Sequence, residues 1–188
     1  ALLQGRYAKT GMITTSGFGD ILELARQRRP HFFKLDVQKP TPVIENDLRV
    51  EIDERIDYSG NIITQLDKVK IIEGLNHFKN KNVEAIVINF LHSYANPTHE
   101  IEAKKLIIDN WPEIYCCTSS EVLSEYREFE RFSTTSINAS LMPIMDRYLA
   151  EFENGVGSIG IKAKPRVLQS NGGAVSCQAI RKMPVNTF

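Results

Sequence analysis

The chain has 188 residues, enough for one ample domain, and its hydrophobic fraction of 42% is typical of a globular protein. Lysine and arginine together number 23, as do aspartate and glutamate, so the formal net charge is zero. Nucleic-acid-binding modules usually carry excess basic charge, so this neutrality argues against one. No apolar run reaches the roughly 18 residues that a membrane helix needs, and we expect no membrane span.

The first part of the chain predicts a short strand, a helix and a connector. Residues 12–15 form a β-prone run that a Ser-Gly pair closes. Asp20 is a candidate helix N-cap, followed by apolar residues, and the arginines before Pro30 suit a helix end. Prolines make residues 31–47 an extended connector, because proline fixes φ and lacks an N–H donor.

An antiparallel hairpin is predicted next. Residues 48–56 alternate between apolar and charged side chains, which is typical of a half-solvated strand. A Tyr-Ser-Gly-Asn turn at residues 58–61 leads into a short return strand at 62–63.

The middle of the chain predicts a parallel sheet. Elements of alternating type follow one another there, namely a helix at 67–81, a strand at 83–91, a helix at 97–111 and a strand at 113–119. The first of these strands is almost entirely apolar, which indicates burial on both faces. This order is the signature of parallel crossover connections within an α/β fold.

The last third of the chain predicts a long helix and then short elements. Residues 120–155 read as one helical zone that Pro143 kinks or interrupts and that a Gly-Val-Gly sequence ends. A short strand at 166–169, a tight turn at 170–173 and a final short helix capped by Ser176 follow.

Three cysteines occur, at positions 116, 117 and 177. The adjacent pair lies in a predicted strand, where neighbouring side chains point to opposite faces, so the two cannot act together as a metal-ligand pair. We expect all three to be buried, unpaired thiols and the protein to reside in the reducing cytoplasm.

Three places could carry chemistry, and each has a simpler structural reading. His92 follows the most buried strand, where α/β sheets bind ligands, and could carry a proton or anchor a polar group. The simpler reading is a histidine that bonds its own loop. Asn171, Gly172 and Gly173 follow a strand and let the backbone approach a ligand, or they simply form a turn, since no phosphate-loop spacing is present.

The third place is a charged stretch of the predicted long helix, consisting of Glu121, Glu125, Arg127, Glu128 and Arg131. Residues four apart share a helix face, so the carboxylates and guanidiniums could hold a polar substrate at a cleft. The simpler reading is a solvated helix crossed by salt bridges. A docking surface for another protein is a further alternative.

Taken in order, four segments resemble the amino-terminal region of the hydantoinase A / 5-oxoprolinase family. They are TTSGFGDILE at 14–23, LHSYANP at 91–97, SSEVL at 119–123 with YREFER at 126–131, and QSNGG at 169–173. The resemblance spans almost the whole chain. It implies a mixed sheet with flanking helices, part of an architecture related to actin, Hsp70 chaperones and sugar kinases, which is ribonuclease H-like.

The resemblance also implies an activity. Members of this family are ATP-dependent hydrolases that open cyclic amides of the hydantoin or 5-oxoproline type through a phosphorylated intermediate, with a divalent metal such as Mg²⁺. Relatives are the ATP-using subunits of acetone and acetophenone carboxylases, and a non-catalytic interaction domain is the remaining alternative. A second subunit or domain of the hydantoinase B type is the implied partner. In that setting the nine candidate residues named above are expected to line the substrate cleft, with no catalytic residue assigned.

The family's glycine-rich phosphate loops are not found in the sequence. We therefore expect a fragment of a larger enzyme, inactive by itself, with ATP and metal bound outside it. Residues 1–160 would belong to the amino-terminal region and residues 161–188 would begin the following hydantoinase A segment.

Overall fold

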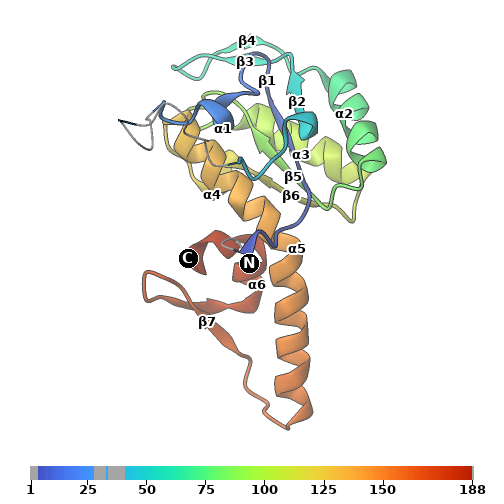
Figure 1. Cartoon of the computed structure of the whole chain (residues 1–188), viewed down its shortest axis with the longest axis vertical. Coiled ribbons are helices and arrows are strands. Elements are labelled where there is room, and N and C mark those ends of the chain that lie inside the picture. The colour runs from blue at the N-terminus through green and yellow to red at the C-terminus, as the bar shows by residue number, and fades with distance from the viewer. Residues whose placement is uncertain (1–3, 28–32, 34–40, 188) are drawn as a thin grey trace.

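The computed structural model describes residues 4–27, 33 and 41–187 (Figure 1). Its centre is a four-stranded parallel sheet in the order β2-β1-β5-β6. The strands are β1 (Thr10–Thr15), β2 (Arg49–Ile52), β5 (Ala85–Asn89) and β6 (Tyr115–Thr118). Every residue of β1 and β5 is buried, so the apolar run at 83–91 correctly predicted a central strand.

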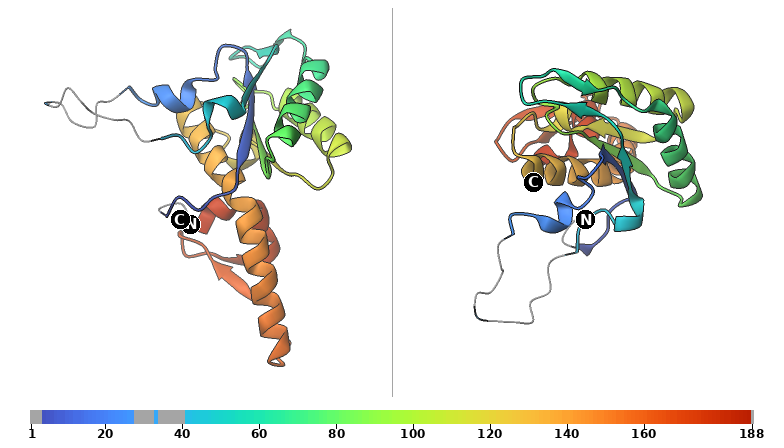
Figure 2. Two further views of the ribbon diagram at one scale, coloured as in Figure 1. Left: turned by 45° about the vertical axis from the view of Figure 1, so that its right-hand side comes forward. Right: turned by 90° about the horizontal axis from the view of Figure 1, so that it is seen from above.

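Helices cover both faces of this sheet. Gly11 of β1 faces α2 (Lys68–Asn80), because an added Cβ there would lie 2.8 Å from the Phe78 ring. On the other face, the Cys117 thiol donates to the Thr135 carbonyl of α5 (Glu128–Ser158) at 3.9 Å. α3 (Thr98–Asn110) packs beside α2, so the sheet lies between α2 and α3 on one side and α5 on the other (Figures 1 and 2).

The starts of α2, α3 and α6 follow their sequence signals closely. The Asp67 side chain accepts from the Lys70 N–H at 3.0 Å, and the Ser176 side chain accepts from the Ala179 N–H at 3.3 Å ahead of α6 (Cys177–Lys182). α3 begins at Thr98, one residue later than predicted, with the Asn96 side chain accepting from its N–H at 3.1 Å. Capping by these side chains satisfies backbone donors that the helix itself leaves free.

The predicted hairpin forms only in part. β3 (Arg55–Ile56) pairs with β4 (Ile62–Thr64) in antiparallel fashion, whereas β2 joins the parallel sheet instead. The prediction of one strand over 48–56 was therefore wrong. The reason lies at Glu54, whose buried side chain turns away from the hairpin to bond Thr15 and His99.

The first helix is shorter than predicted. α1 (Ile21–Leu24) has four residues, and the Asp20 side chain makes no capping hydrogen bond. Ala25 and Gln27 have φ values of 49° and 52°, which end the helix well before Pro30. Much of the predicted connector, residues 31–32 and 34–40, lies outside the described residues, and its last part contains the 3-10 turn η2 (Asn46–Leu48).

The predicted continuous helix over 120–155 was also wrong. The short α4 (Ser119–Val122) ends at Leu123, which is extended, and α5 starts only at Glu128. α5 then continues as one helix of 31 residues through Pro143, and the Gly-Val-Gly sequence lies inside its last turn. The break occurs where the Arg131 guanidinium binds the Glu125 carbonyl at 2.6 Å, and Leu123 and Arg127 on either side have extended backbones.

A smaller unit packs on the carboxyl-terminal half of α5 (Figure 1). It contains the antiparallel hairpin of β7 (Arg166–Leu168) and β8 (Ala174–Ser176), then α6 and the 3-10 turn η3 (Pro184–Thr187). The strand β8 was not predicted. Among the described residues, the core of this smaller unit consists of Leu149, Cys177 and Ile180, whereas the main core contains 22 buried residues. Within the part of the chain that the structure describes, no helix is long and apolar enough to cross a membrane.

All three cysteines are buried and free, as predicted. Burial raises the pKa of the Cys117 thiol to about 12, and burial likewise raises the pKa values of Cys116 and Cys177. A nucleophilic role for these thiols finds no support, because thiolates are the reactive form.

Two glycine-to-alanine substitutions test the packing of the sheet against α2. We expect Gly11→Ala to lower the free energy of unfolding by about 1–3 kcal/mol, because the new methyl group would overlap the buried Phe78 ring. A methyl group added by Gly155→Ala in α5 has no neighbour within 4 Å, so this substitution should raise the free energy of unfolding by about 0.5–1 kcal/mol through helix propensity. Urea denaturation of both variants measures the difference. Equal effects would contradict the packing described.

Candidate functional site

The polar residues of the fold gather where β1, β5 and β6 end. A buried carboxylate, Glu100 in the first turn of α3, joins two of these ends. It accepts from the Phe90 N–H at 3.0 Å, the Ser119 hydroxyl at 2.6 Å and the Ser120 N–H at 2.8 Å. The Ser119 hydroxyl has one proton, which it donates to Glu100. The Ser93 hydroxyl, 2.8 Å away, must therefore be the donor in the hydrogen bond between the two serines. Burial raises the pKa of Glu100 despite these hydrogen bonds.

A second buried network lies at the end of β1. The Thr15 hydroxyl donates to Glu54 and accepts from the Leu91 N–H at 2.9 Å. The other Glu54 oxygen accepts from His99 Nδ1 at 2.7 Å. His99 is 1% exposed, and its Nε2 atom has no hydrogen-bond partner among the described residues. Thr15, Glu54 and His99 therefore attach the β3–β4 hairpin and α3 to the end of β1.

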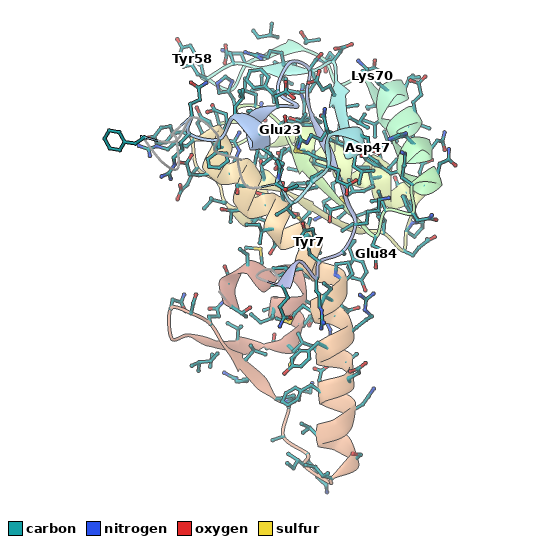
Figure 3. All side chains as sticks on the ribbon, viewed as in Figure 1. Tyr7, Glu23, Asp47, Tyr58, Lys70 and Glu84 are labelled. Atoms are coloured by element: carbon teal, nitrogen blue, oxygen red, sulfur yellow. The ribbon has the colours of Figure 1, made fainter. Side chains whose placement is uncertain are left out.

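His92 lies in the loop that follows β5, in a left-handed conformation with φ of 56°. Its Nδ1 atom donates to the Ile56 carbonyl at 2.7 Å, which assigns the proton because a carbonyl can only accept. The Asn96 amide donates to the Gly60 carbonyl at 2.8 Å. The β3–β4 hairpin, with Tyr58 near its outer end (Figure 3), is thus bonded to this loop.

Arg131 connects this loop with the start of α5. Its guanidinium is buried, donates to the Phe90 carbonyl at 3.0 Å and lies 5.5 Å from the centre of the Tyr94 ring. Tyr94 in turn contacts the His92 ring edge-to-face at 6.0 Å. Burial lowers the pKa of Arg131, and the charge of Glu100 is the largest opposing influence. The structure therefore brings His92 and Arg131 together through Tyr94.

The other charged candidates lie at the surface. Glu121 completes the capping box of α4 and pairs with Lys104 at 2.6 Å. Glu125 and Arg127 are exposed in the extended segment, and Glu128 begins α5 half-buried. Because the helix is broken at residues 123–127, Glu121 and Glu125 do not share a helix face, and that part of the prediction was wrong.

Asn171, Gly172 and Gly173 lie apart from this group, in the turn between β7 and β8 (Figure 1). The backbone donors of both glycines are used inside the turn. Gly172 N–H donates to the Gln169 carbonyl at 2.9 Å, and Gly173 N–H donates to the Asn171 side chain at 2.9 Å. The turn accordingly offers no free pair of N–H groups to a phosphate.

Neither of the two places considered for a phosphate suits one. The Gly-Gly turn lacks free donors, and the first turn of α5 carries Glu128 and Glu130, which would repel a phosphate. In the described ranges no three His, Cys, Asp or Glu side chains group as metal ligands.

Two further polar residues were not singled out from the sequence. Asn89, at the end of β5, is fully buried, and neither atom of its amide has a partner within the described part of the chain. Ser136 of α5 is also buried, and its hydroxyl likewise has no hydrogen-bond partner within the described part of the chain. Val87, two residues before Asn89, pairs with Cys117, which faces α5, so strand alternation puts Asn89 on the α5 face as well. An asparagine in an apolar strand was the available sequence signal.

The fold and this set of residues define the class of protein. A family model described as "Hydantoinase/oxoprolinase N-terminal region" matches residues 1–110, more than half of the chain. A second model, described as "Hydantoinase/oxoprolinase", matches residues 131–188. The chain belongs to the hydantoinase/oxoprolinase family, which confirms the resemblance seen in the sequence.

Individual relatives sharpen this placement. An uncharacterized protein of Methanocaldococcus jannaschii is 42% identical over 94% of this chain and 26% of its own length. The caprolactamase subunit alpha of Pseudomonas jessenii is 31% identical over 100% of this chain and 27% of its own. The acetophenone carboxylase gamma subunit of Aromatoleum aromaticum is 28% identical over 92% of this chain and 25% of its own. The chain thus spans about a quarter of the length of these relatives.

Solved structures agree. The ATP-dependent caprolactamase from Pseudomonas jessenii superposes with a TM-score of 0.89 at 29% identity, over 99% of this chain and 28% of that chain. Nucleotide-free acetone carboxylase superposes with a TM-score of 0.82 at 22% identity, over 98% of this chain and 28% of that chain, which shows a likeness of fold alone. The predicted α/β architecture of the actin and Hsp70 kind is confirmed.

The titration of Glu100 gives a testable prediction. The folded chain holds its proton more tightly than the unfolded chain, so the contribution of Glu100 to stability is present at low pH and is lost as the pH rises above 4.5, its ordinary pKa. Glu100→Gln removes this titration. We expect the stability of the unmodified chain relative to this variant to fall with rising pH, measured by urea denaturation between about pH 4 and pH 8.

Glu73→Gln, an exposed change on α2, is the matched control and should leave the pH dependence unchanged. A constant difference between the unmodified chain and Glu100→Gln across the pH series would contradict a raised pKa for Glu100.

Proposed function

We propose that this chain is part of a larger ATP-dependent enzyme that opens cyclic amides of the hydantoin, 5-oxoproline or lactam type through a phosphorylated intermediate. The observation that carries the proposal is the match to ATP-dependent caprolactamase over 99% of this chain. A 5-oxoprolinase of Arabidopsis thaliana, 28% identical over 92% of this chain and 15% of its own length, supports the same substrate class.

Within that enzyme, we assign the polar residues at the ends of β5 and β6 to one wall of the substrate cleft. The inner layer of the wall consists of buried groups, Glu100 and Arg131, which fix the ends of β5 and β6. The outer layer consists of the exposed Glu125 and Arg127 beside Tyr126, which is 63% exposed. Exposed charge on a fixed frame suits the orientation of a polar ring substrate. His92 and Glu128 would support this layer from the neighbouring loop and helix.

In this proposal ATP and a divalent metal bind to other parts of the enzyme, in keeping with the poor fit of the Gly-Gly turn and the first turn of α5 to a phosphate. A second subunit or domain of the hydantoinase B type is the proposed partner, in keeping with the subunit names of the caprolactamase and carboxylase relatives. The same proposal divides the chain at about residue 160. It also places the protein in the cytoplasm, where free thiols persist.

The test uses the full polypeptide, supplied with its second subunit. We expect phosphate release from ATP to be stimulated by 5-oxoproline, a hydantoin or a lactam. Arg127→Gln should raise the KM for anionic 5-oxoproline about tenfold, the loss of one charge-assisted hydrogen bond, and change the KM for a neutral lactam far less. Lys105→Gln, an exposed change on α3, is the control for lost surface charge.

Absence of stimulation by every cyclic amide would count against the hydrolase. Bicarbonate-dependent turnover of a ketone, with a metal-bearing second subunit, would instead favour a carboxylase subunit, the alternative that the acetophenone carboxylase relative supports. Unchanged turnover but lost subunit binding in the double variant Arg127→Ala, Glu128→Ala would favour a docking surface.

A further inference from the structure

The carboxyl-terminal half of α5 carries an apolar stripe that is covered along only one edge. Successive residues of a helix are turned by about 100°, so apolar positions spaced by three and four share one face. The members of the stripe are Met145, Tyr148, Leu149, Phe152, Val156 and, just past the last helical residue, Ile159.

The covered edge faces the small unit. Leu149 is 1% exposed and packs with Cys177 and Ile180 of α6, and Met145 packs against the same cluster. Beyond this edge, Glu153 pairs with Arg181 of α6 at 2.6 Å. The hairpin and α6 thus cover one side of the stripe and end there.

The other edge is uncovered. Tyr148 is 60% exposed, Phe152 41% and Ile159 72%. Tyr148 and Phe152 stack with ring centroids 6.4 Å apart and an interplanar angle of 4°, so they form one continuous surface. Figure 3 shows side chains more sparsely spaced along the carboxyl-terminal half of α5 than around the sheet. Single exposed apolar residues are ordinary, whereas a joined set of large ones marks an interaction site.

The β7–β8 hairpin is incomplete in the same way. Val167 and Val175 pack toward the small cluster, and alternation puts Leu168, which is 70% exposed, and its pairing partner Ala174 on the opposite face. No residue of either strand is buried. A two-stranded hairpin with one bare face is marginally stable in water and gains stability when it packs against further structure.

We infer that Tyr148, Phe152 and Ile159 form the docking surface for an apolar helix or sheet face of the same polypeptide, from residues outside these 188. The occupant is argued from length: this chain spans 28% of the caprolactamase chain it superposes on, and the second family match runs through this unit, residues 131–188. The inference rests on the longer polypeptide of the proposed function, but its test needs neither substrate nor nucleotide.

The test compares amide hydrogen exchange in the full polypeptide and in the 188-residue chain. Exchange of the amides of residues 148–158 should be on the order of tenfold slower in the full polypeptide, because docking suppresses local opening of α5. The double variant Tyr148→Gln, Phe152→Gln should abolish this slowing in the full polypeptide and have little effect in the 188-residue chain. Glutamine favours helix more than tyrosine or phenylalanine does, so loss of helix propensity cannot explain the result.

Ile101→Gln is the matched control, since Ile101 is 59% exposed on α3, in the main unit. It should leave exchange of residues 148–158 unchanged in both proteins. If β5 amides show that the 188-residue chain is unfolded by itself, the comparison is made within the full polypeptide, where the double variant should accelerate exchange about tenfold and Ile101→Gln should not.

Two results would overturn the inference. One is equal exchange in both proteins, or in the full polypeptide with and without the double variant. The other is slower exchange of residues 148–158 at higher concentrations of the 188-residue chain, together with formation of a dimer in solution. That result would assign the surface to a second copy of the chain. Failure of the enzyme assay with normal protection of α5 would count against the proposed reaction only.

Discussion

The carboxyl edge of the sheet depends on the two opposite charges that bind Phe90. Glu100 of α3 accepts from the N–H of this residue at 3.0 Å, and Arg131 of α5 donates to its carbonyl at 3.0 Å. The two helices lie on opposite faces of the sheet, so a single residue at the end of β5 fixes both. Both side chains are fully buried, so loss of either would leave the Phe90 group that it binds without its partner inside the protein, which costs more than loss of an exposed hydrogen bond.

The remaining loops follow from this arrangement. Glu100 also binds Ser119 and Ser120, so the start of α4 is placed by the same carboxylate that holds β5. Arg131 binds the Glu125 carbonyl and the Phe90 carbonyl, and residues 123–127 are non-helical, with Tyr126 and Arg127 exposed. The broken helix is therefore associated with the hydrogen bonds of one buried guanidinium, which helix propensity does not reveal.

Local signals in the sequence predicted the elements whose causes are local. The buried strand at 83–91 follows from its apolar run, and the starts of α2 and α6 follow from Asp67 and Ser176. The error in the hairpin arises from distant residues. The Glu54 carboxylate accepts hydrogen bonds from Thr15, 39 positions away, and from His99, 45 positions away, so the chain at Glu54 does not continue the predicted strand. Glu100 looks like an ordinary acidic residue of a first helical turn, and periodicity cannot reveal its burial.

The candidate residues of the charged stretch differ in what a substitution there can change. Arg131 holds the backbone, so its loss would alter the loops themselves, while Glu125 and Arg127 stand on those loops and contact solvent. A frame of buried hydrogen bonds beneath exposed charge lets the chemistry of the surface change without a change of fold. Such a separation suits a family whose relatives are named for lactams, 5-oxoproline and acetophenone on one shared architecture. Under the proposed function, substrate preference would reside in the outer layer, and the placement of that layer in Phe90 and the two buried side chains that bind it.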